Sequence, residues 1–180
     1  VVSSCSVLFQ GAMSGVAIST YPCEDADMLS AEAQYAGMEA DLQYKLDNYE
    51  ILYPDYDEYH YDLDEIQHDP YVLISMLTAL QGGQWAIDDV QDDLAMLFEK
   101  QYQLTQTVTV KDSGDTEYTV CTVTLHNENL SHLPVFIMSE DKVSMYAMYM
   151  STLGNRTDLF PTSVYPNASI KKEYTDYDLP

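Results

Sequence analysis

Acidic side chains crowded between residues 55 and 65 are the first candidates for chemistry in this sequence. Calcium binds six to eight hard oxygen ligands, and carboxylates at this density could supply them. The spacing differs from an EF-hand loop, because the central glycine and the terminal glutamate are missing. The segment is therefore either a calcium site or a solvated acidic loop, and we favour the solvated loop. The carboxylates concerned are Asp55, Asp57, Glu58, Asp62, Asp64 and Glu65.

The same segment is rich in tyrosine and could form a binding surface. Tyrosine combines a large apolar ring with a hydroxyl group, and such side chains are enriched at interfaces. The rings could contact a protein or a glycan strand, or the segment could fold back and bury them on the helices. Both alternatives remain open for Tyr53, Tyr56, Tyr59 and Tyr61.

Nucleophilic catalysis by cysteine requires a thiol with a lowered pKa and a histidine partner. Cys23 lies beside two acidic residues, which would raise the pKa of its thiol instead. Cys121 is expected to be a buried structural thiol, because it alternates with apolar residues. No catalytic residue is assigned, and the alternative of an acidic pair that cleaves glycan strands stays open because the chain has 30 Asp and Glu residues.

The histidines show no spacing typical of a zinc site. No His-Glu-x-x-His motif occurs, and two His with nearby acids are a weak signal on their own. His68 directly precedes Asp69-Pro70, so we expect it to be part of a helix cap. No metal or other cofactor is assigned, apart from the calcium hypothesis.

The charge balance excludes some partners. The chain has 7 Lys and Arg against 30 Asp and Glu, a net charge of −23. Such a surface repels nucleic acid, anionic lipid headgroups and anionic wall polymers, whereas basic partners and divalent cations are permitted. The three cysteines have no Cys-x-x-Cys spacing, so they do not indicate a disulfide framework. No apolar run is long enough for a complete membrane-spanning helix.

Apolar residues at helical spacing predict a long helix over residues 25–49 and a shorter, largely buried one over 70–80. Further helices are predicted over 87–101 and 140–153, and Trp85 is expected to pack between the second and third helices. These elements should supply the core.

Alternating residues predict a β-hairpin, with strands over 104–110 and 117–125 joined by a Ser-Gly-Asp turn. Residues 53–69 are predicted to form a loop, and 133–138 a short third strand. The expected fold is α+β: a small helical cluster with one β-hairpin packed on it and an extended C-terminal linker. Residues 1–24 are expected to be an uncharged leader, 25–158 the domain, and 159–180 a linker.

Several long runs resemble the membrane-proximal region of exported hydrolases of Firmicutes conjugative elements. The resemblance covers the chain from about Val7 to Pro180. The runs that carry it are Asp57–Ile66, His68–Ser75, Leu97–Leu104 and Tyr149–Pro161.

The resemblance implies a parent protein with a membrane anchor, this region, and then an NlpC-type papain-like cysteine peptidase domain that cuts peptidoglycan peptides. The peptidase motif, Asp-Cys-Ser-Gly with a partner His, would follow Pro180, so no catalytic residue carries over to this chain. The implied location is extracytoplasmic, at the surface or wall of a Gram-positive bacterium, with membrane attachment only through an upstream anchor.

The expected function is therefore that of a non-catalytic accessory domain that positions a cell-wall hydrolase of a conjugative element. Its expected partners are the downstream peptidase domain and proteins of the wall or the conjugation apparatus, without nucleic acid. Two alternatives are retained: a glycan-strand hydrolase that uses an acidic pair, and a calcium-dependent adhesion or assembly module.

Overall fold

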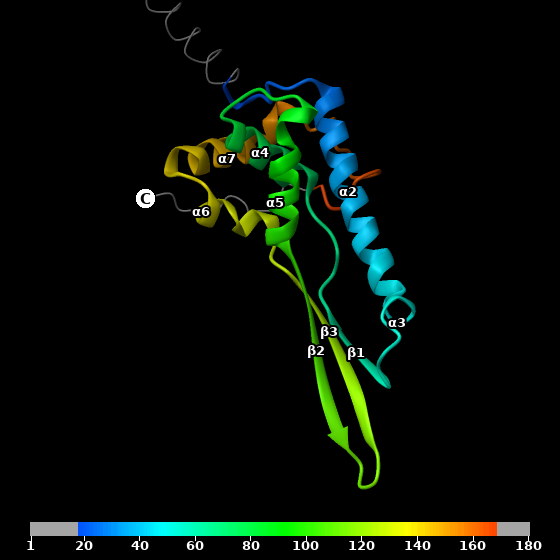
Figure 1. The fold of residues 1–180 in the computed structure, drawn as a ribbon. Helices are drawn as coiled ribbons and strands as arrows, with labels where there is room; N and C mark the ends of the chain where they lie inside the picture. The colour runs from blue at the N-terminus through cyan, green and yellow to red at the C-terminus, as the bar shows by residue number, and fades with distance from the viewer. Residues whose placement is uncertain (1–17, 169–180) are drawn as a thin grey trace, which may run out of the picture.

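The computed structural model describes residues 18–168, in which a helical head sits at one end of a three-stranded sheet (Figure 1). The fold is α+β, as predicted. The α-helices are α2 (Asp25–Asp47), α3 (Tyr49–Leu52), α4 (Pro70–Gln81), α5 (Gln91–Gln101), α6 (Pro134–Ile137) and α7 (Glu140–Thr152). Short 3-10 turns are η1 (Ile87–Val90), η2 (Leu130–His132) and η3 (Leu153–Asn155), and the strands are β1 (Glu58–Leu63), β2 (Tyr102–Asp112) and β3 (Glu117–Asn127). No helix among the described residues is long and apolar enough to cross a membrane.

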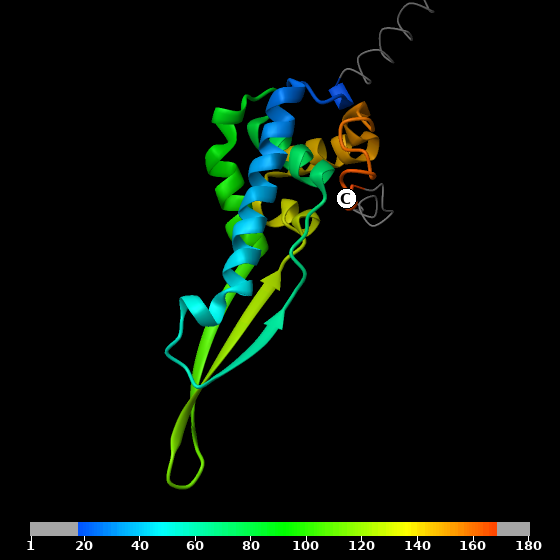
Figure 2. The same ribbon diagram turned by 90° about the vertical axis from the view of Figure 1, so that its right-hand side faces the viewer.

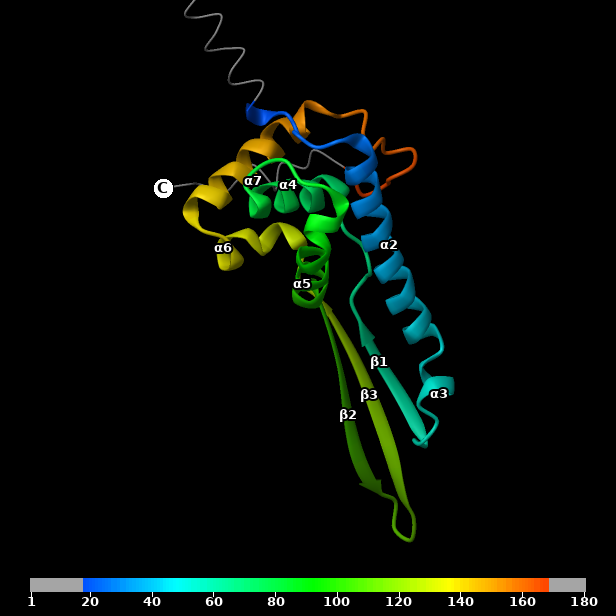
Figure 3. The ribbon, with the colours of Figure 1, turned by 45° about the horizontal axis from the view of Figure 1, so that its top comes forward.

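Helix α4 is the centre of the helical head. It is buried on nearly every side, with α2 and α5 against one flank and α7 against the other (Figures 1 and 3). Trp85 packs into this core as predicted, and its indole Nε1–H donates to Thr78 Oγ1 at 3.1 Å. The helix ends at Gly82, whose positive φ of 73° suits the left-handed cap that glycine favours.

The N-terminus of α4 is capped by a side chain. Asp69 is only 7% exposed, and its carboxylate accepts the backbone N–H of Tyr71 at 2.9 Å, while Pro70 occupies the first helical position. By contrast Ser139, at the N-cap of α7, makes no side-chain cap hydrogen bond.

This difference gives a matched pair of substitutions. Asp69→Ala is expected to lower the free energy of unfolding by about 1 kcal/mol, because a buried backbone N–H loses its acceptor. Ser139→Ala is expected to change it by much less. Urea denaturation followed by circular dichroism measures both, and equal losses would contradict this account of the cap.

The sheet has the strand order β1-β3-β2. Strands β2 and β3 form the predicted antiparallel hairpin, with Tyr102 opposite Asn127 at one end and Asp112 opposite Glu117 at the other. The turn of the hairpin projects furthest from the helical head (Figure 1). The third strand is β1, which pairs with β3 in parallel, from Glu58 opposite Val120 to Leu63 opposite Leu125.

Two local predictions are therefore wrong. The segment 53–69, predicted as a loop, contains β1, because Tyr59, Tyr61 and Leu63 alternate with polar residues and present one apolar face. The segment 133–138, predicted as a strand, contains α6 instead, because Pro134 has no N–H for a strand ladder but fits the first turn of a helix. The predicted helix over 25–49 divides at Asn48 into α2 and α3.

The packed unit also extends beyond residue 158, where the predicted linker would begin. Leu159 and Phe160 are buried in the helical core, as is Ala168, and the Phe160 ring contacts the Tyr71 ring edge-on at 5.1 Å between centroids. No helix or strand forms between Arg156 and Ala168, in agreement with the prolines there. The expected leader lies mostly outside the described residues, as does the end of the expected linker.

Candidate interaction surface

A second, smaller core lies between the end of α2, α3 and the sheet. One face of β3 carries Cys121, Val123 and Leu125, all essentially inaccessible, and they pack against Leu46 and Tyr49. Cys121 is thus the buried thiol that its alternation predicted, and burial raises its pKa. This core holds α3 over one face of the sheet.

The four candidate tyrosines divide into two pairs at this core. Tyr56 and Tyr59 are half-buried and contact each other edge-on, with ring centroids 5.8 Å apart. Tyr53 and Tyr61 are 37% and 41% exposed, and both rings pack against Tyr49, at 4.6 and 6.4 Å between centroids. Two of the four rings are thus partly buried and two are more exposed, and binding by the exposed pair stays a prediction.

Hydrogen bonds fix these rings in place. The Tyr49 hydroxyl donates to Gln106 Oε1 on β2 at 2.5 Å, and Gln106 Nε2 donates to the Tyr56 hydroxyl at 2.7 Å. The Tyr59 hydroxyl donates to the backbone carbonyl of Tyr53. Tyr49, which is fixed in this way, packs against the exposed rings of Tyr53 and Tyr61, so those two rings are presented in a defined geometry.

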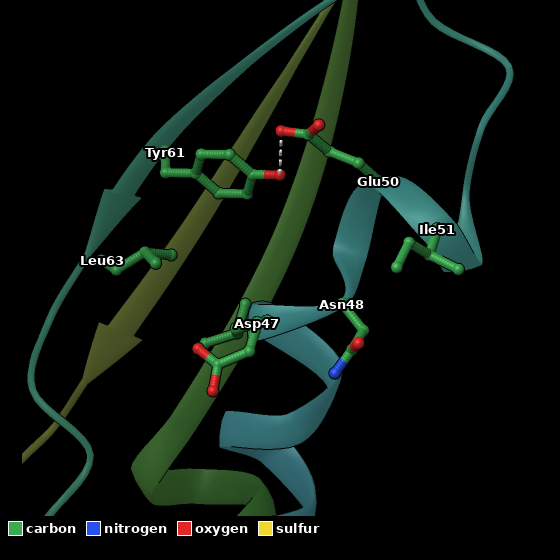
Figure 4. Close-up of a pocket in the computed structure, with 7 residues that line it drawn as sticks. Asp47, Asn48, Glu50, Ile51, Tyr61 and Leu63 are labelled. Atoms are coloured by element: carbon green, nitrogen blue, oxygen red, sulfur yellow. Dashed lines mark hydrogen bonds between the residues drawn. The ribbon is translucent and has the colours of Figure 1, made fainter.

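Between β1 and α3 the surface is hollowed (Figure 4). The hollow has a volume of about 550 Å³, and the Tyr61 hydroxyl donates to Glu50 Oε1 across it at 3.2 Å. Desolvation, the hydrogen bond and the negative charge of Glu50 together raise the pKa of Tyr61 to about 12, so this hydroxyl stays protonated. The residues that line the hollow are Leu46, Asp47, Asn48, Glu50, Ile51, Tyr61 and Leu63.

Large apolar side chains surround the hollow and face solvent. Ile51 is 78% exposed, Leu52 49% and Leu63 41%. Together with Tyr53 and Tyr61 they form what we call the α3–β1 surface. Several exposed large apolar side chains near one hollow are typical of a binding site.

The acidic residues near this surface have few counter-charges. The sequence has no Lys or Arg between Lys45 and Lys100, and Lys45 itself lies over the Tyr53 ring at 5.7 Å. Glu50 and Asp47 line the hollow, while Glu58 and Asp62 are exposed on β1. The potential around the α3–β1 surface is therefore negative.

Two of the calcium candidates fasten the ends of β1 to β3 instead. Asp57 accepts the backbone N–H of Thr119 at 2.7 Å and its hydroxyl at 2.9 Å. Asp64 accepts the backbone N–H of Asn127 at 2.8 Å and lies 3.0 Å from His126 Nδ1. These hydrogen bonds hold the pKa of both carboxyl groups below the usual range.

The remaining calcium candidates are spread along the strand and beyond it. Glu58 Oε1 lies 2.5 Å from His60 Nε2, and Glu65 accepts from Gln67 Nε2 at 2.9 Å. Asp55 lies before the strand, and Asp62 lies within it. Within residues 18–168 no three His, Cys, Asp or Glu side chains are grouped so that they could hold a metal ion.

We therefore expect calcium to leave the melting temperature of the chain unchanged. A specific ion that binds only the folded state would raise stability, by an amount that grows with the logarithm of its concentration above the Kd. Differential scanning fluorimetry measures the melting temperature with calcium, with magnesium at equal ionic strength, and with a chelator. The comparison separates specific calcium binding from screening of the −23 charge. A rise with calcium alone would support the calcium hypothesis.

The histidine next to the α4 cap has a different environment from the one predicted. His68 does not cap α4; its ring lies between two glutamates of α2, with Nε2 2.8 Å from Glu32 Oε2 and Nδ1 2.9 Å from Glu39 Oε2. The His68 side chain is 4% exposed, and the Tyr35 ring covers it edge-on at 4.8 Å. This buried cluster joins α2 to the segment that leads from β1 into α4.

Further hydrogen bonds link the cluster to the end of α5 and the start of β2. The Tyr102 hydroxyl donates to Glu39 Oε1 at 2.5 Å, and the Tyr35 hydroxyl donates to Gln101 Oε1 at 2.7 Å. Sequence reasoning missed this cluster, although Glu32, Tyr35 and Glu39 share one face of the predicted helix by their spacing. A buried, fully bonded cluster of this kind positions the sheet on the helical head.

Neither described cysteine is placed for catalysis. Cys23 and Cys121 are both buried free thiols, and burial raises the pKa of each. Cys5 lies outside the described residues.

No family model matches this chain, and no curated protein or solved structure matches it significantly.

Proposed function

We propose that this chain is a non-catalytic accessory domain that positions an exported cell-wall hydrolase by binding a partner protein through the α3–β1 surface. The observation that carries the proposal is the exposed tyrosine and aliphatic patch beside a preformed hollow. The exposed rings of Tyr53 and Tyr61 pack against Tyr49, whose hydroxyl is hydrogen-bonded to Gln106, so they lose little conformational entropy on binding and suit protein recognition.

The charge of the chain favours a protein partner over the wall polymer. A net charge of −23 opposes contact with anionic wall polymers and with anionic lipid surfaces. The resemblance to the membrane-proximal region of conjugative-element hydrolases supports a role beside a peptidase domain, at the surface or wall of a Gram-positive bacterium. The partners on this proposal are that peptidase domain and proteins of the wall or the conjugation apparatus.

The chemistry of the described cysteines and of His68 supports a non-catalytic role. A buried thiol with a raised pKa is a weak nucleophile at neutral pH, and both described cysteines are of this kind. His68 is enclosed by Glu32, Glu39 and Tyr35, where no substrate reaches its ring nitrogens.

Incubation with purified Gram-positive peptidoglycan tests the non-catalytic role. We expect mass spectrometry to detect no fragments released by this chain, next to a muramidase as positive control. Release of glycan fragments would overturn the proposal and favour the acidic-pair hydrolase.

A pair of surface variants in the implied parent hydrolase tests the positioning role. Ile51→Asp places a charge on the α3–β1 surface and is expected to displace the hydrolase from its site at the cell surface. Phe136→Asp, at an 81% exposed position on α6, is the matched control and is expected to leave the location unchanged. Equal localisation of both variants and the parent would contradict a role for this surface.

A further inference from the structure

Strand β1 has an open edge. It is the outermost strand of the sheet and pairs only with β3, and no described helix or strand lies along its other edge (Figure 2). An outermost strand presents unpaired backbone N–H and C=O groups to solvent. An extended peptide can add to such an edge by main-chain hydrogen bonds, and pockets for its alternate side chains give specificity.

The hollow lies where an added strand would place its side chains. Tyr61 and Leu63 point from β1 into the hollow, toward Ile51 and Glu50 on α3 (Figure 4). Alternate side chains of a strand lie on the same face of a sheet. Every second side chain of a peptide along β1 would therefore enter the hollow beside Tyr61 and Leu63, and the others would lie on the opposite face beside Glu58 and Asp62.

The charge along β1 selects the occupant. Carboxylates line both faces: Asp47 and Glu50 in the hollow, and Glu58 and Asp62 on the strand. A second copy of this chain would bring another acidic β1 against them, and the like charges would repel. A segment rich in Lys or Arg would be attracted instead.

The other open edge of the sheet lacks these features. The charged residues of β2 are Lys111 and Asp112, which offset each other, and Lys100 precedes the strand, so β2 has no excess of acidic side chains like that of β1. Its exposed Val108 and Val110 do not line the hollow. The geometry and the charge together favour the β1 edge over the β2 edge.

We infer that the edge of β1 binds a basic, extended segment of a partner protein as a fourth strand, with apolar side chains in the hollow between β1 and α3. The inference rests on the proposed function and specifies the partner of the α3–β1 surface. The carboxylates that prevent this edge from pairing with β1 of a second copy of the chain also provide the selectivity for a basic strand.

Three labelled peptides of equal length test the inference by fluorescence anisotropy on the full chain. The first alternates lysine with valine and is expected to bind, with an affinity that falls as salt rises. The second has glutamate for lysine and is expected not to bind. The third keeps every lysine but has proline for valine, which removes backbone N–H donors, and is expected to bind at least about tenfold more weakly. Equal binding of the first and third peptides would exclude strand addition.

Charge-reversed variants locate the site. The double variant Glu58→Lys, Asp62→Lys, with both changes on β1, is expected to lower the affinity for the lysine–valine peptide by about tenfold or more. Asp92→Lys with Glu99→Lys, both exposed on α5, changes the net charge equally and is expected to have a much smaller effect. Equal losses of affinity in the two variants would mean that the peptide is held by general charge attraction and not at β1.

Hydrogen exchange then distinguishes the two edges. With the lysine–valine peptide bound, amides of residues 58–63 are expected to gain protection, and those of residues 102–112 to be unchanged. Protection on β2 alone would place the peptide on the β2 edge and contradict the inference. A dimer in sedimentation without peptide would favour a second copy of the chain as the occupant of the β1 edge. These readouts are independent of peptidoglycan cleavage, so the inference and the proposed function can fail separately.

Discussion

Gly154→Ala is expected to destabilise this protein by roughly 2–4 kcal/mol, although it adds a single methyl group. Gly154 has φ 61° and ψ 19°, in the left-handed region, where alanine is strained. A Cβ at this position would overlap Cδ2 of the Tyr21 ring, well inside van der Waals contact. The added methyl group therefore requires either the backbone or the ring to move.

The Tyr21 ring cannot move without further losses. It is 5% exposed, its hydroxyl lies 2.7 Å from Ser75 Oγ on α4, and its ring centroid is 5.5 Å from that of Tyr149. Its backbone N–H also donates to the carbonyl of Gly154 at 3.1 Å. These contacts fasten the segment before α2 to the end of α7, so displacement of the ring would loosen both.

Gly37→Ala is the matched control for this substitution. Gly37 lies in the middle of α2, and a Cβ added there would meet no atom within 4 Å. Alanine is the better helix former, so Gly37→Ala is expected to stabilise the chain by about 0.5–1 kcal/mol. Urea denaturation of both variants measures the two opposite changes. Stabilisation by Gly154→Ala as well would show that the contact with Tyr21 does not exist in solution.

The elements that sequence reasoning predicted well are those whose signals are local. Helix α4 has its cap, its first-turn proline and its terminal glycine within the segment 69–82, and the structure has a helix over Pro70–Gln81. The hairpin has two alternating runs around a short turn, and its strands occupy Tyr102–Asp112 and Glu117–Asn127. In both cases neighbouring residues contain the information.

The elements that were missed depend on distant partners. Strand β1 pairs in parallel with residues 120–125 of β3, and no turn near either strand indicates that pairing. Its high charge favours a loop, whereas the alternation of Tyr59, Tyr61 and Leu63 indicates the strand that the structure contains. The buried tail is similar, because nothing local in Leu159 or Phe160 specifies the core that receives them.

The candidate surface was predicted in part. The tyrosine-rich segment was identified from composition, and the structure places Tyr53 and Tyr61 at an exposed surface. The hollow was not foreseeable, because Leu46, Ile51 and Leu63 come together only when β1 lies opposite α3. Which rings are buried depends on the same packing.

His68→Gln is expected to lower the free energy of unfolding by about 3–5 kcal/mol near pH 6, more than any of the other substitutions. Glu32 and Glu39 are 6% and 13% exposed, and the His68 ring is the cation that contacts both. Glutamine can donate a hydrogen bond but carries no charge, so two nearly buried carboxylates would lose their counter-ion. His126→Gln, at a 55% exposed ring that also contacts two acids, is the matched control and is expected to change stability little.

The same cluster predicts how stability depends on pH. Burial lowers the pKa of His68, but the hydrogen bonds to Glu32 and Glu39 and their charges outweigh it and raise the pKa from 6.5 to about 9. The folded state therefore holds this proton more tightly than the unfolded state does. The resulting stabilisation is complete below about pH 6.5 and is lost as pH rises through about 9, by an amount on the order of 3 kcal/mol.

Urea titrations of wild type and His68→Gln between pH 6 and 9.5 measure this linkage. The wild-type curve is expected to fall across the interval, and the variant curve to lack that component, so the two should converge at high pH. Parallel curves would mean that another group takes up the proton. If the variant unfolds completely, the wild-type curve alone still tests the linkage. The raised pKa requires His68 to be charged between its two carboxylates. A wild-type stability that is flat from pH 6.5 to 9 is therefore incompatible with a charged imidazole at the junction of sheet and helical head.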